Sequence, residues 1–401
     1  MNDITHLEEE LRQIELLFLK IRDRRERLLK DLNGCTSLLA PIRRLLRETL
    51  LQIFSVLASS DTPNLFDAPW VLGHVCSDWR TISRSCPTLW TNIYILPSLF
   101  YSSTFLEEYV SLCRDQPIQL ELALQVHAEY IPDPLSVLVR HCQRWSSLDV
   151  TLNFDMLSKF LTWVSLPAIR LKKINISLIG RLQKILHVAY NNPFSSSPIM
   201  EATLQHVRYS YLPINMTSLR RFGLHSYDPL EVHTIFQYSQ HLTEFIITPA
   251  GPPRPFNINS SAIIYPQVHH TSLRQFSFVL IRENTRQVAK ILLDYLTLPA
   301  LQQFQVLALQ TEQLAAILPG DLEPVEYSRI INLFRRSECS LTELTFSVPV
   351  PVNSFLLPIL RQSPALEQLD IFVNAEIAGD VFGALTLADG SACFQSEDTA
   401  C

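Results

Sequence analysis

The stretch PWVLGHVCSDWRTISRSCPTLWTNI, residues 69–93, is the most distinctive part of the chain. Three of the five tryptophans, Trp70, Trp79 and Trp90, fall within it. Its apolar residues recur at intervals of three and four, which is the spacing of one face of an α-helix. Pro87 then ends the helix, and the β-favouring run TNIYIL follows. The stretch therefore predicts one helix followed by a strand.

A second amphipathic helix is predicted immediately upstream, in LLRETLLQIFSVL. Leu46, Leu50, Ile53 and Leu57 recur there at helical spacing and share one face. Residues 41–96 as a whole are expected to form three short helices, which together make a small all-α domain.

These two helices resemble the F-box of the F-box-like proteins that are abundant in mushroom-forming fungi. In that family a heptad helix precedes a Leu-Pro-x-Glu-Ile-Leu start, followed by a Pro-Trp-x-Leu-x-x-Val-Cys-x-x-Trp-Arg core and a Pro-x-Leu-Trp end. The start departs from the family, because LLRETL (45–50) lacks the proline after the first leucine. The residues that match the core and the end are Pro69, Trp70, Leu72, Val75, Cys76, Trp79, Arg80, Pro87, Leu89 and Trp90.

The resemblance implies a protein partner. In the family, the exposed apolar face of the F-box docks on the Skp-type adaptor of a cullin–RING ubiquitin ligase, and large apolar side chains usually carry such interfaces. Trp79 is expected to be a core residue. The residues expected to bind the adaptor are Ile42, Leu45, Leu46, Leu50, Ile53, Phe54, Trp70, Leu72, Val75 and Trp90.

Residues 4–32 carry apolar residues at alternating intervals of three and four, the pattern of a coiled-coil seam, with Arg25 as the one break. Asn33-Gly34 is expected to end this heptad helix, which sets an N-terminal segment at 1–33. The apolar stripe has two interpretations: it packs back on the chain's own body, or it pairs weakly with a second copy. The sequence leaves both open.

From residue 117 onward the chain repeats a short pattern, apolar-x-x-apolar-x-apolar, with helical stretches such as 231–240, 288–297, 327–336 and 353–362 between many of the repeats. A strand followed by a helix at this period is the plan of leucine-rich repeats, whose units stack into a solenoid. The repeats begin at Trp145, Leu171, Leu204, Leu219, Leu242, Leu273, Leu301, Leu341 and Leu366.

The predicted fold class is therefore α/β. It consists of the heptad helix, the F-box-like domain and an irregular leucine-rich-repeat solenoid at 117–375. Residues 376–401 are expected to form an uncapped or disordered tail, and 191–198 and 248–270 to form inserted loops. The residues expected to face solvent on the concave side are Asp149, Thr151, Asn175, Ser177, Arg208, Gly223, Ser277, Gln305, Thr345, Ser347, Asp370 and Phe372.

Composition argues against several functional classes. A net charge of −6 disfavours a general nucleic-acid binder. The acidic N-terminus and the lack of an apolar run of about 20 residues predict no secretory signal and no membrane span. The eight cysteines include no CxxC pair, which suits reduced thiols in the cytoplasm or nucleus.

The sequence also contains no GxGxxG, GxxxxGK[ST], GxSxG or HExxH motif. We therefore predict a protein that is not an enzyme, with no catalytic residue, metal or cofactor. The predicted function is that of a substrate-receptor subunit of a cullin–RING ubiquitin ligase, with the adaptor on the F-box and an unknown target protein on the repeats. The alternative is a non-catalytic interaction scaffold, dimeric through residues 4–32, that no longer engages the ligase.

Overall fold

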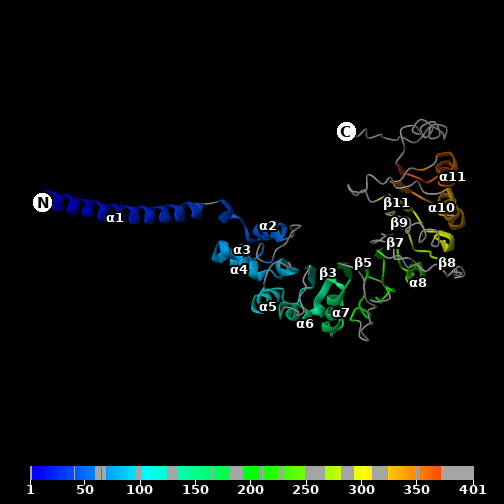
Figure 1. Ribbon diagram of the computed structural model, residues 1–401, viewed down its shortest axis with the longest axis horizontal. Helices are drawn as coiled ribbons and strands as arrows, with labels where there is room; N and C mark the ends of the chain where they lie inside the picture. Colours follow the sequence, from blue (N-terminus) through cyan, green and yellow to red (C-terminus); the bar gives the residue numbers. More distant parts are fainter. Residues whose placement is uncertain are drawn as a thin grey trace. The chain divides into compact units, whose positions relative to one another are not determined.

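The protein is a mixed α/β chain with a long N-terminal helix and a large parallel sheet, as the sequence predicts (Figure 1). It divides into two compact units, Met1–Leu89 and Trp90–Cys401. The computed structural model describes residues 2–39, 41–58, 65, 69–95, 101–123, 133–164, 166–179, 193–207, 209, 212, 214–225, 229–248, 267–280, 293–308, 324–347, 350 and 352–371.

The first unit is helical. Its elements are α1 (Asn2–Leu39), the short 3-10 helix η1 (Pro41–Arg44), α2 (Arg47–Ala58), α3 (Leu72–Val75) and α4 (Ser77–Ser85), and η2 (Pro87–Trp90) leads out of it.

Helix α1 is longer than the sequence predicts. It continues through Gly34 to Leu39, although Asn33-Gly34 was expected to end it. A single glycine inside a helix costs only about 1 kcal/mol relative to alanine. The Thr36 hydroxyl donates a hydrogen bond to the Leu32 carbonyl across this point (2.9 Å). The expected stop signal is therefore too weak to act here.

The expected single helix over the tryptophan-rich stretch is broken into two. Cys76 has an extended backbone (φ −160°, ψ 172°), and this separates α3 from α4. The Cys76 sulfur then accepts a hydrogen bond from the Trp79 amide and caps α4. Arg80 ties the two helices together by donating from Nε to the Gly73 carbonyl (2.7 Å).

The core of the first unit forms where α2 meets α4. The fully buried Phe54 ring lies 4.9 Å from the ring of Trp79, measured between centroids. Leu50 and Leu72 are also buried. Arg47 adds a hydrogen bond from Nη2 to the Ser85 hydroxyl (2.7 Å). Trp79, expected to be a core residue, packs against the buried Phe54 but is itself only half-buried.

The second unit is built on one sheet of 11 parallel strands, in which spatial order follows chain order without exception. Its strands are β1 (Asn92–Ile95), β2 (Ile118–Ala123), β3 (Trp145–Asn153), β4 (Lys173–Ile179), β5 (Glu201–Gln205), β6 (Arg221–His225), β7 (Glu244–Ile247), β9 (Gln275–Leu280), β11 (Gln303–Ala308), β12 (Glu343–Phe346) and β13 (Gln368–Ile371). Strands β8 (Val268–His269) and β10 (Leu296–Thr297) form a separate parallel pair.

Helices connect many of these strands and gather on one side of the sheet (Figure 1). They are α5 (Ser103–Leu112), α6 (Asp133–Arg140), α7 (Phe154–Trp163), α8 (Pro229–Tyr238), α10 (Pro324–Ser337) and α11 (Leu357–Gln362), with the 3-10 helix η3 (Cys142–Arg144) and the π-helical turn η6 (Val352–Leu356). A helix was predicted at residues 288–297, of which the structure describes 293–297. Residues 293–295 are helical, and Leu296 and Thr297 form strand β10. Residues 249–266, the predicted tail 376–401, Arg208 and Phe372 lie outside the described residues.

The sheet begins earlier than residue 117. Trp90, Ile93 and Ile95 already carry the repeat pattern, and β1 pairs with β2 in parallel. Trp90 is buried and packs edge-on against Tyr109 of α5, with ring centroids 5.1 Å apart. The Cys113 thiol donates to the Trp90 carbonyl (2.9 Å). The boundary expected at residue 96 is therefore wrong, because Trp90 belongs to the second unit.

One strand lies upstream of its predicted place. The pattern indicated a repeat starting at Leu204, yet β5 spans Glu201–Gln205. The three apolar positions are occupied by Ile199, Ala202 and Leu204, and all three are buried. Because alanine is a weak marker of a core position, the sequence pattern placed the start of this repeat at Leu204 instead of Ile199. The same error made the interval to the next repeat, at Leu219, unusually short.

Aromatic rings form a continuous core under the later strands. Phe222, Phe245, Phe276 and Phe304 occupy matching register positions on β6, β7, β9 and β11. Neighbouring rings in this series lie 6.2, 5.8 and 6.0 Å apart. Such close aromatic pairs add about 0.5–1.5 kcal/mol each beyond their buried area. These four rings, called the Phe ladder below, fix the register of the later strands. They also support the other face of the sheet, which points away from the core.

Candidate functional site

Part of the predicted adaptor-binding set lies at the surface of the first unit. Ile42, Leu45, Leu46, Ile53 and Val75 are exposed, and Leu46 is the most exposed of them at 72%. Trp70 is half-buried beside His74, with ring centroids 5.9 Å apart. Six of the ten predicted residues are therefore accessible to a partner.

The other four predicted residues are buried. Leu50, Phe54 and Leu72 pack inside the first unit, and Trp90 is 1% exposed inside the second. A side chain in either position cannot reach a docked partner. The pattern assigned these residues to the surface because a sequence shows an apolar stripe without showing which part of it the chain itself covers.

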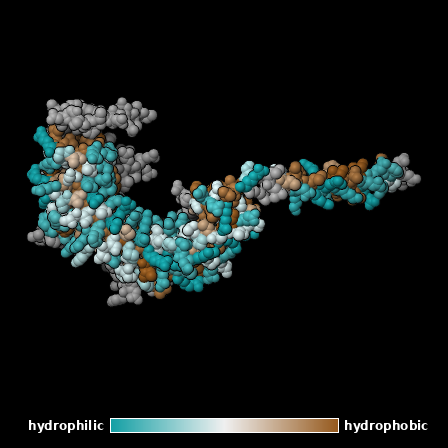
Figure 2. Space-filling model, turned by 180° about the vertical axis from the view of Figure 1, so that it is seen from behind, coloured by the Kyte–Doolittle hydropathy of each residue, from teal (hydrophilic) through white to brown (hydrophobic). Residues whose placement is uncertain are grey.

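The predicted adaptor-binding set leaves out three exposed apolar residues, Val56, Leu57 and Val71. The signal was present in α2, whose sequence RETLLQIFSVLA carries more apolar residues than one buried face requires. Leu46, just before α2, and Ile53, Val56 and Leu57 of α2 are exposed, while Leu50 and Phe54 of the same helix are buried. These four exposed residues are called the α2 patch below. Figure 2, in which hydrophobic residues are brown, shows such residues at the surface of the first unit.

Helix α1 is exposed along its length. Every residue from 4 to 36 is solvent-exposed, including Leu7, Leu11, Ile14 and Phe18 of the predicted stripe. Figure 2 shows this apolar material along the helix in brown. Within the first unit, the described residues therefore leave the stripe uncovered.

The uncovered face of the sheet in the second unit presents aligned rows of side chains, since alternate residues of each strand point away from the core. The middle row contains most of the residues expected to face solvent, but Gly223, Ser277 and Thr345 in it are buried by their neighbours. By strand register it runs through Tyr94, Glu121, Asp149, Asn175, Thr203, Gly223, Ile246, Ser277, Gln305, Thr345 and Asp370.

Several polar groups on this face bond to one another. Strand-to-strand hydrogen bonds link Asn175 Nδ2 to Asp149 Oδ2 (2.8 Å), Ser177 Oγ to Gln205 Oε1 (3.1 Å), Ser277 Oγ to Gln305 Oε1 (3.2 Å) and Gln305 Nε2 to Glu343 Oε1 (3.0 Å). Burial, with a smaller contribution from Asp149, raises the pKa of Glu121. The face is thus a polar surface whose neighbouring strands are cross-linked by side-chain hydrogen bonds.

At the start of the strands, opposite charges alternate. Lys173, Glu201, Arg221 and Glu244 are register neighbours on β4 to β7. Lys173 Nζ lies 3.8 Å from Glu201 Oε2, and Arg221 Nε lies 2.5 Å from Glu244 Oε2. The hydrogen bond and charge of Glu244 raise the pKa of Arg221. These four charges are used in pairs within the protein.

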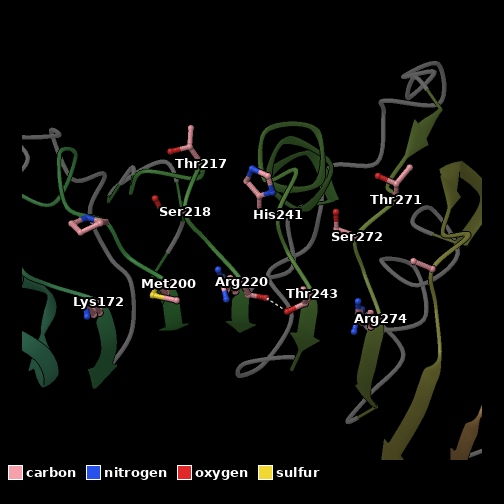
Figure 3. A pocket seen from close by; sticks show the side chains of 12 residues that line it. Lys172, Met200, Thr217, Ser218, Arg220, His241, Thr243, Thr271, Ser272 and Arg274 are labelled. Carbon is pink, nitrogen blue, oxygen red and sulfur yellow. Dashed lines mark hydrogen bonds between the residues drawn. The ribbon is translucent and has the colours of Figure 1, made fainter.

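One residue before this charge ladder, a groove of about 750 Å³ follows the strand starts (Figure 3). Lys172, Met200, Arg220, Thr243 and Arg274 come directly before β4, β5, β6, β7 and β9 and form its base in Figure 3. Loop residues complete the lining: Pro198, Thr217, Ser218, His241, Thr271, Ser272 and Ala300. The lining contains basic and hydroxyl groups and no carboxylate.

The groove also had a sequence signal that was overlooked. The residue after the first leucine of a repeat is basic in LKK (171–173), LRR (219–221) and LRQ (273–275), and it is neutral in the repeats between them. Once the order of the strands in the sheet is known, these basic residues are seen to precede every second strand. The alternation could not be recognised from the sequence, because the pattern did not place β5 correctly.

Histidines and cysteines of the described residues do not gather into a reactive centre. No three His, Cys, Asp or Glu side chains come close enough there to hold a metal ion. Burial, together with nearby His206, lowers the pKa of His225 to about 4. Burial raises the pKa of the Cys113 and Cys339 thiols to about 11, and no described cysteine is in a disulfide. These groups are structural.

Within the described ranges, no helix combines the length and the apolar character needed to cross a membrane. No protein-family model matches the chain, and no curated protein matches its sequence significantly.

Proposed function

We propose that this protein is the substrate-receptor subunit of a cullin–RING ubiquitin ligase. In this proposal the first unit is an F-box-like domain that docks on a Skp-type adaptor. The second unit is a leucine-rich-repeat solenoid that holds a target protein.

The observation that carries the proposal is the α2 patch. Val56 and Leu46 are both 72% exposed, beside a core that already buries Leu50 and Phe54. Burying a large aliphatic side chain fully is worth about 1.5–3 kcal/mol. A helix of a small unit that leaves four such groups in water has a surface suited to a protein partner. The resemblance of residues 69–93 to an F-box core supplies the class of partner.

The second unit supports the other half of the proposal. The 11 strands of the large sheet lie in the order in which they occur in the chain, and all of them are parallel. That order is what stacked strand–connection repeats produce. An extended polar face along such an array is suited to binding a protein, and the sequence carries no motif for chemistry there.

Size-exclusion chromatography of the full chain mixed with a purified Skp-type adaptor tests the proposal. We expect a one-to-one complex at micromolar protein, lost when Leu46 and Val56 are both changed to Asp. Because both residues are exposed, circular dichroism should show the double variant folded. Separate elution of the unchanged chain and the adaptor would refute the proposal.

A second function is favoured by one specific observation, the uncovered stripe on α1. A non-catalytic scaffold that dimerises through residues 4–32 would cover that stripe with a second copy. Light scattering distinguishes the two: the scaffold requires a dimer that becomes a monomer on changing Leu11 and Phe18 to Asp. A monomeric unchanged chain would remove the scaffold hypothesis.

A further inference from the structure

The groove along the strand starts of the second unit has an unused set of charges. Lys172, Arg220 and Arg274 are all exposed. The ion pairs found among the described residues do not include any of the three. These three residues, called the groove cations below, differ in this respect from Lys173 and Arg221 one position later, which are paired with glutamates.

The surplus charge of this strip is positive. The strip comprises the first residue of β4, β5, β6, β7 and β9 and the residue before each. It holds five basic residues and two acidic ones, Glu201 and Glu244. Three positive charges are therefore left without a partner, on a chain whose net charge is −6. Local charge of the opposite sign to the whole molecule indicates a site for an anion.

The groove cations are also regularly spaced. They precede β4, β6 and β9, which are every second strand of this part of the sheet, while Met200 and Thr243 precede the strands between them. Neighbouring strands lie about 4.8 Å apart, so successive groove cations are about 10 Å apart and the row spans roughly 19 Å. The occupant should repeat its negative charge at the same interval.

A polyproline II segment has that repeat. It has three residues per turn and rises about 3.1 Å per residue, so every third side chain returns to the same face after about 9 Å. An α-helix returns to the same face after about 5.4 Å, which matches every strand rather than every second one. Hydroxyl groups of Ser218 and Ser272 line the groove wall and can donate to backbone carbonyls of such a segment.

We propose that this groove binds an acidic, extended segment of the target protein, with a glutamate or aspartate at every third residue and one carboxylate on each groove cation. Three carboxylates balance the three surplus charges, whereas three phosphates would overcompensate them. The inference rests on the proposed role of the second unit as the target-binding part, and it names the chemistry of the target.

Fluorescence anisotropy of the full chain with a labelled Glu-Pro-Pro repeat peptide tests the inference. About nine residues suffice, because glutamates at positions one, four and seven then span roughly 19 Å. We expect binding that weakens with added salt. We also expect it to be at least fivefold tighter than for a peptide of the same composition with the three glutamates adjacent. Equal binding of the two peptides would overturn the proposal.

Protein variants locate the site. Arg220→Gln and Lys172→Gln should each weaken binding about fivefold, the effect of losing one exposed charge pair. Arg361→Gln, an equally exposed arginine on α11, is the matched control and should leave binding unchanged. An unchanged affinity in folded Arg220→Gln and Lys172→Gln proteins would place the peptide elsewhere and contradict the inference.

Two competing ligands and one partner complete the test. A phosphoserine peptide that binds more than tenfold tighter than the glutamate peptide, or a single-stranded RNA that displaces it, would overturn the carboxylate assignment. The adaptor complex of the Arg220→Gln protein should form normally. For the unchanged protein, an adaptor complex without peptide binding refutes the groove alone, and peptide binding without an adaptor complex refutes the ligase role alone.

Discussion

The two units treat their apolar and polar groups in opposite ways. The first unit is small and leaves Leu46, Val56 and the stripe of α1 in water. The second buries its aliphatic and aromatic residues under an 11-stranded sheet, and several polar side chains of its strands bond to one another. The first unit thus leaves an apolar surface in water, which the proposed adaptor would cover. In the second unit, the groove cations take part in none of the ion pairs found among the described residues.

The largest expected effect compares the two units directly. Phe276→Ala should lower the free energy of unfolding by about 3–5 kcal/mol, because its buried ring contacts those of Phe245 and Phe304. Val56→Ala, also an apolar truncation, should change it by less than about 0.5 kcal/mol. Chemical denaturation followed by circular dichroism measures both. Similar losses in the two proteins would contradict the contrast.

Acid should destabilise the second unit through His225. Its pKa is about 4 in the folded chain and 6.5 ordinarily, so the unfolded chain binds more protons between these values. The stabilisation is present above pH 6.5 and is lost as the pH falls toward 4. From pH 7 to 5 we expect a loss of about 2 kcal/mol.

A single variant isolates this contribution. His225→Gln should remove about that much of the pH dependence of the unfolding free energy. Denaturant titrations at pH 5 and 7 supply the numbers. An identical pH dependence in the His225→Gln protein and the parent would show that His225 does not titrate as described.

A smaller effect is expected at Gly223, in the middle row of the sheet. A Cβ at this position would lie 3.2 Å from both Cγ2 and Oγ1 of Thr203. Gly223→Ala should therefore cost about 1 kcal/mol, and adding Thr203→Ala should recover most of it by removing both atoms. A double-mutant cycle on the free energy of unfolding checks this. Additive losses would exclude the close approach.

The smallest effect concerns the charge ladder. Arg221→Gln breaks the contact with Glu244 at a partly exposed site and should cost less than about 1 kcal/mol. The difference from the parent should shrink as salt screens the pair. Thermal unfolding at low and high ionic strength measures it. A loss of several kcal/mol would mean that the charge ladder contributes more than the Phe ladder to holding the strands together.

Sequence reasoning located the strands well where large residues mark the core. The repeats at Leu219, Leu242, Leu273 and Leu301 are confirmed, because leucine and phenylalanine occupy their buried positions. At β5 the middle core position is Ala202, and the register slipped. Periodicity depends on the contrast between core and surface residues, so it fails where the core residue is small.

The candidate surfaces were harder to derive. Whether Leu50 or Leu46 is exposed to solvent depends on where α4 packs against α2. The spacing of apolar residues within α2 does not carry that information. The groove can be recognised only when the order of β4 to β9 in the sheet is known, because that order places Lys172, Arg220 and Arg274 before alternate strands. A local contact of this kind is simpler: Asn153, the last residue of β3, caps α7 by accepting a hydrogen bond from the Met156 amide (2.8 Å).

The most direct test of the central proposal is the affinity of the full chain for a Skp-type adaptor, measured by titration calorimetry. Leu46→Asp and Val56→Asp should each weaken binding by about 30-fold or more, as for residues at the centre of an interface. Ile169→Asp makes the same change at an exposed residue of the second unit and should leave the affinity unchanged. Equal affinities for all four proteins, or no binding by the parent chain, would contradict adaptor docking through the α2 patch.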